Sequence, residues 1–170
     1  IILHEGLQNA VDSFFELDEE QFAEIENPSI KVTFDLEQNQ IIIRDNGTGI
    51  NITQWVNLIR MHRSPKGAII EEKSNTKSPI RRALKGSQGV GIKLTMLCTD
   101  FFKLETTYED SGKMKTWGFE VKDWFSYINN SKDGKELHIN EPEDKDSQEE
   151  STGTVITYSI DEGFQIEDQN

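Results

Sequence analysis

The sequence predicts an α+β fold, in which helices pack against a largely antiparallel sheet. Three observations support this prediction. The chain opens with an amphipathic helical pattern over Ile1–Leu17. Ser29–Leu36 alternates apolar and polar residues, and Gln40–Arg44 follows it after a tight turn, which is typical of a β-hairpin. A second pair of predicted strands, Asp100–Tyr108 and Lys113–Val121, is joined by a turn of sequence EDSG.

The next elements follow in chain order. The segment from Asp18 to about Ile25 is predicted to form a turn or a short second helix, which the Asn27-Pro28 pair ends. Thr53–Met61 returns to helical spacing after the glycine-rich turn DNGTGI. Residues 62–87 are polar and basic and show no regular pattern. A loop of this length inside one domain is usually functional or disordered.

The second half of the chain adds one helix and the strands that close the sheet. The apolar run Ile92–Leu97 is predicted to be helical. Glu136–Asn140 is predicted as a short strand and Gly153–Ile160 as the closing strand. Between them lies the acidic segment Glu141–Ser151, whose simplest interpretation is a solvated loop. Because no linker or repeat divides the chain, residues 1–170 are expected to form a single domain.

Composition limits the classes of protein to which the chain can belong. Its 170 residues suffice for one domain with a core, and 34% hydrophobic and 29% charged residues predict an ordered chain. It contains no apolar run long enough to span a bilayer and no leader, so we expect no membrane association and a cytoplasmic location, or a nuclear one in a eukaryote. The net charge of −13 argues against a grip on bare nucleic acid by this domain alone.

The opening helix carries a polar stripe. Glu5, Asn9 and Asp12 lie four and three residues apart, which places them on one helix face. A buried stripe of carboxylates and amides costs free energy unless it binds something. The alternative is a solvated polar face. For Asp12 a salt-bridged or solvated surface carboxylate is as good an interpretation as a role in a site.

Two glycine-rich turns follow further along the chain. Asp45–Ile50 (DNGTGI) ends the second predicted strand, and Gly86–Gly91 (GSQGVG) precedes the third predicted helix. Each is a weak signal alone, because Asp-Asn-Gly is a common turn sequence and glycine-rich turns have several uses. The informative feature is their order and spacing after the E-x-x-x-N-A-x-D helix.

In combination these motifs resemble the GHKL superfamily, the ATP-binding domains of DNA gyrase, the 90-kDa heat-shock chaperone, histidine kinases and MutL. The resemblance runs from Leu3 to about Tyr158 and includes Gly153, Thr154 and Ile156 of a closing G-T-x-I strand. The form GSQGVGI is most similar to topoisomerase VI B subunits and to MutL- and MORC-like ATPases. The resemblance implies a Bergerat-type two-layer α/β sandwich, with a mostly antiparallel mixed sheet, helices on one face and a long ATP lid.

The resemblance implies a catalytic end of the site on the opening helix. Glu5 matches the general base that activates water against the γ-phosphate. Asn9 matches the residue that ligates Mg²⁺, for which an amide oxygen is a suitable hard ligand. Asp12 matches a position that is often polar in relatives, and its role stays open.

The resemblance also implies an adenine-binding end at the first glycine-rich turn. Asp45 matches the aspartate that accepts the adenine amine, and a carboxylate, which only accepts hydrogen bonds, favours adenine over guanine. Gly47 and Gly49 allow conformations and close approach that a Cβ would block, and Ile50 would pack on the purine. Thr154 matches a threonine that shares a water with the aspartate, although an ordinary strand threonine explains it equally well.

The second glycine-rich turn matches the phosphate loop of the family, where free backbone N–H groups and the helix dipole favour phosphate. The residues implied in nucleotide binding there are Gly86, Ser87, Gln88, Gly89, Val90, Gly91 and Ile92. Residues 62–85 take the place of the ATP lid, for which a basic solvated loop is the alternative. Asn57, on the helix before the lid, is a further candidate for nucleotide contact.

These features predict a Mg²⁺-dependent ATPase that acts as a conformational switch through lid closure or dimerisation, in a DNA-handling or chaperone-like machine. Two alternatives stay open. One is the catalytic domain of a histidine kinase, against which Glu5 argues because relatives that activate water carry this base. The other is a sensor that binds ATP without turnover. The chain opens inside a helix and is expected to be a fragment, with homodimer and DNA contacts outside it and slow turnover when isolated.

Overall fold

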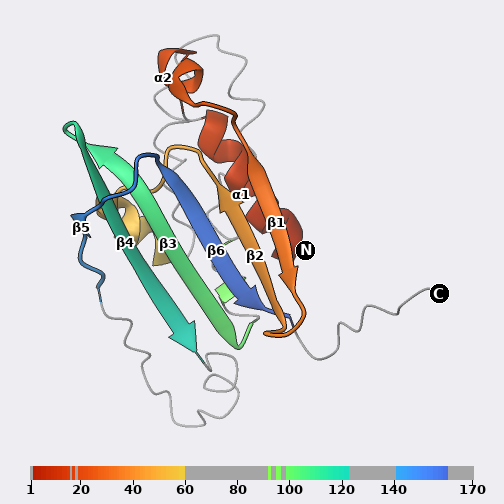
Figure 1. The fold of residues 1–170 in the computed structure, drawn as a ribbon. Coiled ribbons are helices and arrows are strands. Elements are labelled where there is room, and N and C mark those ends of the chain that lie inside the picture. Colours follow the sequence, from red (N-terminus) through yellow and green to blue (C-terminus); the bar gives the residue numbers. More distant parts are fainter. Residues whose placement is uncertain are drawn as a thin grey trace.

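The fold comes from a computed structural model of the chain (Figure 1). The structure describes residues 2–15, 17, 19–59, 92, 95–96, 99–122 and 141–160. Their regular elements, in chain order, are α1 (Ile2–Phe15), α2 (Glu19–Glu24), β1 (Ile30–Asp35), β2 (Gln40–Asp45), the 3₁₀ turn η1 (Ile52–Gln54), α3 (Trp55–Ile59), β3 (Phe101–Asp110), β4 (Lys113–Lys122), β5 (Lys145–Asp146) and β6 (Gly153–Ser159).

A six-stranded sheet of order β1-β2-β6-β3-β4-β5 dominates the described part of the chain (Figure 1). All five of its described strand pairings are antiparallel. The hairpins β1–β2 and β3–β4 form its two sides, and β6 lies between them although it comes last in the sequence. Ile156 of β6 is in register with Ile43 of β2 and with Leu104 of β3. The last strand therefore joins the two hairpins into one sheet.

The hydrophobic core lies on the face of the sheet that the helices cover. Ile43, Ile156 and Leu104 form one buried cross-strand row, and Tyr158 and Phe102 form the next row. The alternation of side chains along each strand places these residues on one face. On the same face, the neighbouring row on the other side of Ile43, Ile156 and Leu104 consists of Asp45, Thr154 and Thr106, and the candidate site lies there.

Aromatic side chains hold α3 against the sheet. Trp55, the first residue of α3, lies edge-to-face against Phe119, with ring centroids 4.7 Å apart, and against Trp117, with centroids 6.0 Å apart. All three residues are buried. Buried aromatic rings contribute large apolar areas, so Trp55, together with the buried Leu58, fixes this short helix.

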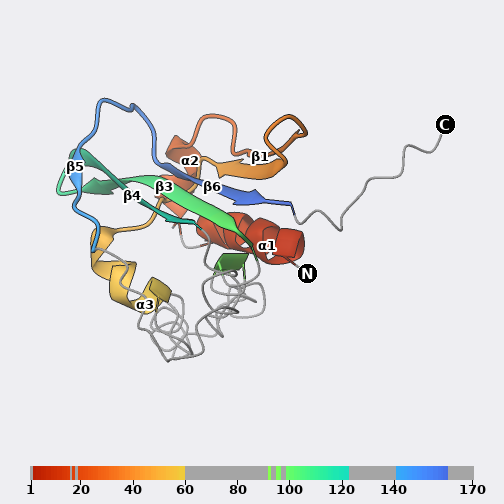
Figure 2. The same ribbon diagram turned by 90° about the horizontal axis from the view of Figure 1, so that it is seen from below.

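The helix α1 crosses the same face of the sheet, as Figure 2 shows. Gly6 is a point of close approach, because a Cβ at this position would meet the side chain of Ile43 on β2. Ala10, one turn further along α1, is buried. Small residues at these two positions let the helix lie close to the sheet and carry its polar residues near the strand ends.

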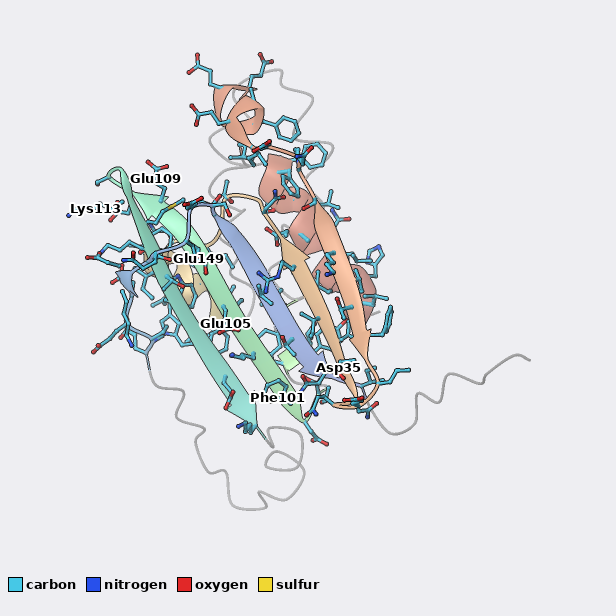
Figure 3. All side chains as sticks on the ribbon, in the orientation of Figure 1. Asp35, Phe101, Glu105, Glu109, Lys113 and Glu149 are labelled. Atoms are coloured by element: carbon cyan, nitrogen blue, oxygen red, sulfur yellow. The ribbon has the colours of Figure 1, made fainter. Side chains whose placement is uncertain are left out.

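The opposite face of the sheet is mostly polar (Figure 3). Lys103 and Glu105 of β3 form an ion pair at 2.9 Å, and Glu120 and Lys122 of β4 form one at 2.8 Å. The Lys122 ammonium also lies 5.9 Å from the centroid of the Phe101 ring. Such exposed pairs contribute little to stability, but they suit a face in contact with solvent.

The structure confirms the predicted α+β fold, with α1 and α3 on one face of the sheet. Every helix and strand predicted within the described residues is present, with each end displaced by no more than two residues. The predicted strand Glu136–Asn140, the predicted lid at residues 62–85 and the Gly86–Gly91 turn lie outside the described residues. None of the described helices has the length and apolar character needed to cross a membrane.

The expectation that Glu141–Ser151 is wholly a solvated loop is wrong for the short strand β5, which lies within it and pairs with β4. Asp146 forms an ion pair with Lys115 at 2.9 Å. Asp144 accepts a 2.7 Å hydrogen bond from the Tyr108 hydroxyl. These two aspartates hold the segment against the sheet edge, although the Asp146 side chain is still exposed to solvent.

Candidate functional site

The end of β2 places Asp45 at the centre of the candidate site. The residue is only 8% exposed, and carboxylates are rarely buried without partners. Its Oδ1 accepts a 3.0 Å hydrogen bond from the Gly47 backbone N–H, which closes the turn after β2. The Ser13 hydroxyl lies 3.3 Å from the same oxygen and 2.8 Å from the Ala10 carbonyl, so its single proton is shared between them. Ser13 thereby ties this turn to the C-terminal end of α1.

The turn after Asp45 requires glycine at two positions. A Cβ at Gly47 would overlap the Ser13 side chain. Gly49 has φ +70°, a conformation that other residues rarely adopt, and a Cβ there would overlap the backbone carbonyl of Thr107 on β3. The close approach that these glycines allow is therefore made by other parts of the protein, because the turn packs on α1 and on β3.

Both backbone polar groups of Ile50 form hydrogen bonds with side chains of the sheet. Its N–H donates to the Thr106 hydroxyl of β3 at 2.9 Å, and its carbonyl accepts a 2.6 Å hydrogen bond from the indole N–H of Trp117 on β4. The sequence candidates include neither Thr106 nor Trp117. Strand alternation places both residues on the core-facing side of their strands, but their register with each other and with Thr154 comes only from the structure.

Thr154 lies on β6 between Asp45 of β2 and Thr106 of β3, in register with both. It is buried, and its hydroxyl oxygen is 3.2 Å from that of Thr106. Thr106 also donates to the Gly153 carbonyl at 3.1 Å. Thr154 is thus part of a buried hydroxyl network beside Asp45, in addition to serving as a β-branched strand residue.

Polar side chains of α1 extend from Ser13, which lies beside Asp45, toward the N-terminus of the helix. Glu5, Asn9 and Ser13 are spaced four residues apart, so they follow one gently winding stripe. Glu5 lies eight residues before Ser13, which corresponds to about 12 Å along the helix axis. The Glu5 side chain is 33% exposed and Asn9 is half-buried. A ligand lying along α1 could therefore contact Asp45 at one end and Glu5 at the other.

Asp12, the third member of the polar stripe predicted from the sequence, is fully buried, with 0% exposure. Its Oδ1 accepts a 2.7 Å hydrogen bond from the Gln8 amide, one turn earlier on α1. The interpretation of Asp12 as a solvated surface carboxylate is therefore wrong. Residue spacing defines a helix face, but it does not define how deeply that face is buried.

The other predicted residues lie at the margin of this site or outside the described chain. Ile92 is helical and packs against the core, and the buried residues Thr95 and Met96 are helical too, which confirms the third predicted helix in part. Asn57 lies on α3, where its amide donates to Gln54 at 3.5 Å. Outside the described residues lie Gly86, Ser87, Gln88, Gly89, Val90 and Gly91.

Solved structures of other proteins share the fold of this chain. The ATPase region of Saccharomyces cerevisiae topoisomerase II matches with a TM-score of 0.60 at 19% identity, over 94% of this chain and 37% of that one. The ATPase and transducer domains of DNA topoisomerase II from Balamuthia mandrillaris match with a TM-score of 0.62 at 23% identity, over 94% and 36%. The chain therefore has the fold of a GHKL ATP-binding domain, as the resemblance implies.

One curated protein is also similar in sequence. The chaperone protein HtpG of Nitrobacter winogradskyi is 26% identical over 169 residues, which cover 95% of this chain. The match covers 24% of HtpG, so the chain spans about a quarter of that protein and little more than a third of the topoisomerase chains. No family model matches the chain.

Proposed function

We propose that this chain binds ATP and hydrolyses it with Mg²⁺, and that it acts as a conformational switch within a larger protein. The observation that carries the proposal is the buried Asp45 carboxylate at the end of β2, set between the glycine turn and Thr154. Proteins that share the fold and whose names describe ATPase regions support it.

The Asp45 end of the site suits adenine. A carboxylate can only accept hydrogen bonds, so it complements the exocyclic amine of adenine and opposes the carbonyl that guanine carries at the same ring position. Because Asp45 is buried, a ligand acceptor placed against it would be left unsatisfied at a high cost in binding free energy. Ile50, whose backbone is fixed by Thr106 and Trp117, would place its side chain against the purine.

The Glu5 end of the site suits the terminal phosphate. The stripe from Ser13 to Glu5 extends about 12 Å along α1, which is comparable with the distance from base to γ-phosphate in an extended nucleoside triphosphate. The Glu5 carboxylate is partly exposed, so it can hold a water molecule and accept its proton as a general base. This role separates water-directed hydrolysis from transfer of phosphate to a protein side chain.

Asn9 would hold Mg²⁺ together with the phosphates. Its amide oxygen is a hard and neutral ligand, and Mg²⁺ usually keeps most of its coordination for water and phosphate oxygens. Asn9 lies one turn from Glu5 on the same face of α1, which suits a cation held beside the terminal phosphates. When bound, Mg²⁺ neutralises charge that develops on the transferred phosphoryl group.

The switch would involve segments around this site. Residues 62–85 are proposed as a lid over the triphosphate, and Gly86–Gly91, with Ile92, as the loop that binds it. A chaperone and two DNA topoisomerases among the similar proteins support a role in a chaperone-like or DNA-handling machine. We propose that homodimer contacts and any DNA contacts lie outside this chain, and that the machine works in the cytoplasm, or in the nucleus of a eukaryote.

Replacement of Asp45 by Asn tests the nucleotide assignment. Asn keeps the size of the side chain and one acceptor, but it presents N–H donors toward the adenine amine. We expect ATP affinity, measured by isothermal titration calorimetry, to fall on the order of 100-fold. Asp100→Asn makes the same charge change at an exposed position and should leave the affinity unchanged. If Asp45→Asn binds ATP as tightly as the unmodified chain, the nucleotide is not bound at this site.

A further inference from the structure

We propose that Thr106 sets the base specificity of the site by locking the Thr154 hydroxyl as a hydrogen-bond acceptor toward the ligand. This inference rests on the proposed ATP site and adds to it a residue that lies in none of the three sequence motifs. Thr106 is buried on β3, and Thr154 separates it from Asp45 in the sheet. It would act as a positioning residue, through Thr154, without touching the base.

The Thr106 hydroxyl uses its one proton and both of its lone pairs in hydrogen bonds. The oxygen lies 2.9 Å from the Ile50 N–H, 3.1 Å from the Gly153 carbonyl oxygen and 3.2 Å from the Thr154 hydroxyl. A hydroxyl has one proton to donate and two lone pairs that accept. The Ile50 N–H can only donate and the Gly153 carbonyl can only accept, so these two bonds use the proton and one lone pair of Thr106.

The third bond fixes the direction of the Thr154 hydroxyl. All three contacts are satisfied together only when Thr154 donates its proton to the second lone pair of Thr106. Both threonines are buried, so an arrangement that leaves the Ile50 N–H or the Gly153 carbonyl unsatisfied would cost free energy. The Thr154 hydroxyl proton therefore points toward the Thr106 oxygen. Thr154 then offers only lone pairs to a ligand.

Two acceptors consequently lie side by side at the base end of the site. Asp45 and Thr154 are cross-strand partners on β2 and β6, and the Asp45 carboxylate also only accepts. A purine amine has two protons to donate toward such a pair. A carbonyl at the same ring position would meet only lone pairs. The pair thus selects an aminopurine over an oxopurine, and Thr106 maintains the selection.

Thr106→Val tests this inference with ATP and inosine triphosphate, which carry an amine and a carbonyl at that ring position. Valine is close to threonine in shape and has no hydroxyl, so the Thr154 hydroxyl becomes free to rotate and donate to a carbonyl. We expect the ratio of ATP affinity to inosine triphosphate affinity, measured by calorimetry, to fall about tenfold, which is the effect of one net hydrogen bond. Thr106→Ser keeps the hydroxyl and should keep the ratio of the unmodified chain.

The affinity ratio separates specificity from a general loss of structure. Valine also leaves the Ile50 N–H and the Gly153 carbonyl without Thr106, which weakens binding of both nucleotides alike and leaves their ratio unaffected. A preference for ATP in the unmodified chain, together with the same ratio in Thr106→Val, would overturn this inference alone. Failure of the unmodified chain to bind either nucleotide would overturn the proposed function and this inference with it.

The unmodified chain gives a second measurement, which holds even if Thr106→Val does not fold. Protons of buried hydroxyl groups exchange slowly enough to be observed by nuclear magnetic resonance when the surrounding sheet is stable. We expect nuclear Overhauser effects between the Thr154 hydroxyl proton and the Thr106 side chain. Effects that place this proton beside the Asp45 side chain instead would contradict the inference.

Discussion

Gly49 shows how strictly a single residue of the site is determined by the packing around it. Its φ of +70° is a conformation in which a side chain is strained, and the carbonyl of Thr107 occupies the place of a Cβ. Gly47, two residues earlier, is confined differently, because its φ is not positive and a Cβ there would meet the Ser13 side chain. Both constraints come from protein atoms, so the turn that presents Asp45 is already shaped in the absence of a ligand.

Alanine at Gly49 should therefore destabilise the fold more than alanine at Gly112, which provides a matched control. Gly112 has φ +75°, but nothing lies within 4 Å of a Cβ at that position. We expect Gly112→Ala to lower the free energy of unfolding by about 1–2 kcal/mol, the penalty for a left-handed residue. Gly49→Ala should cost at least about 1 kcal/mol more, because the backbone must also move. Urea denaturation measures both, and equal losses would show that the turn relaxes around the added methyl group.

At the scale of elements, the sheet and the site both depend on β6. This strand pairs with β2 and β3, supplies Thr154 to the site and supplies Tyr158 to the core. Tyr158 is 3% exposed, and its hydroxyl has no hydrogen-bond partner within the part of the chain that the structure describes. Burial raises the pKa of Tyr158 to about 12. The central strand thus contains a polar group that weakens the fold slightly at neutral pH and more strongly at alkaline pH.

Tyr158→Phe should raise the free energy of unfolding at pH 7 by about 1 kcal/mol, because it removes a buried unsatisfied hydroxyl and keeps the ring. The variant should also resist alkali better. The pKa of this tyrosine is 10.0 in an unfolded chain and about 12 in the folded one, so stability is unaffected below about pH 10 and falls as the pH rises toward 12. Denaturant unfolding at neutral and alkaline pH measures both effects.

Tyr108→Phe is the control for this prediction. Burial, together with the hydrogen bond to Asp144, also raises the pKa of Tyr108 to about 12, so its removal should reduce alkaline sensitivity too. At pH 7, however, the variant loses a 2.7 Å hydrogen bond and should be less stable than the unmodified chain. If Tyr158→Phe is likewise destabilised at pH 7, its hydroxyl has a partner in the folded protein.

The elements could be predicted from the sequence where the signal is local. The strand before Asp45 and the turn after it are adjacent in the chain, so alternation followed by DNGTGI is sufficient to place this residue at a strand end. The bonds from Thr106 and Trp117 to Ile50 join residues 56 and 67 positions apart, and no pattern within one sequence pairs them. The sequence does not predict β5 for the same reason, because this strand pairs with β4, which is not adjacent to it in the chain.

At the scale of the whole molecule, the candidate site joins two layers of the fold. Asp45 and Thr154 belong to the sheet, whereas Glu5 and Asn9 belong to α1, which lies across it (Figure 2). The residues proposed for base binding and for hydrolysis are thus on different layers.

In the full-length protein, Glu5→Ala should still bind ATP but should lose hydrolysis by about 10²–10⁴-fold, the usual contribution of general acid–base catalysis. Calorimetry measures binding, and release of inorganic phosphate measures turnover. Glu20→Ala makes the same side-chain change at an exposed position on α2 and should change neither quantity. Undiminished turnover in Glu5→Ala would rule out the general-base role. Transfer of phosphate to a histidine of a partner protein would support the kinase alternative.

The position of β6 in the sheet has a consequence for how the protein is made. A ribosome releases the two hairpins before it releases β6, and each hairpin can pair through contacts that are local in sequence. Until β6 is synthesised, the edges of β2 and β3 that will face it expose unpaired backbone groups, which favour aggregation. Asp45 gains Thr154 as its neighbour, and Thr154 gains Thr106, in one late event. The nascent chain is therefore most vulnerable, and most dependent on protection by other proteins, in the interval before its central strand is complete.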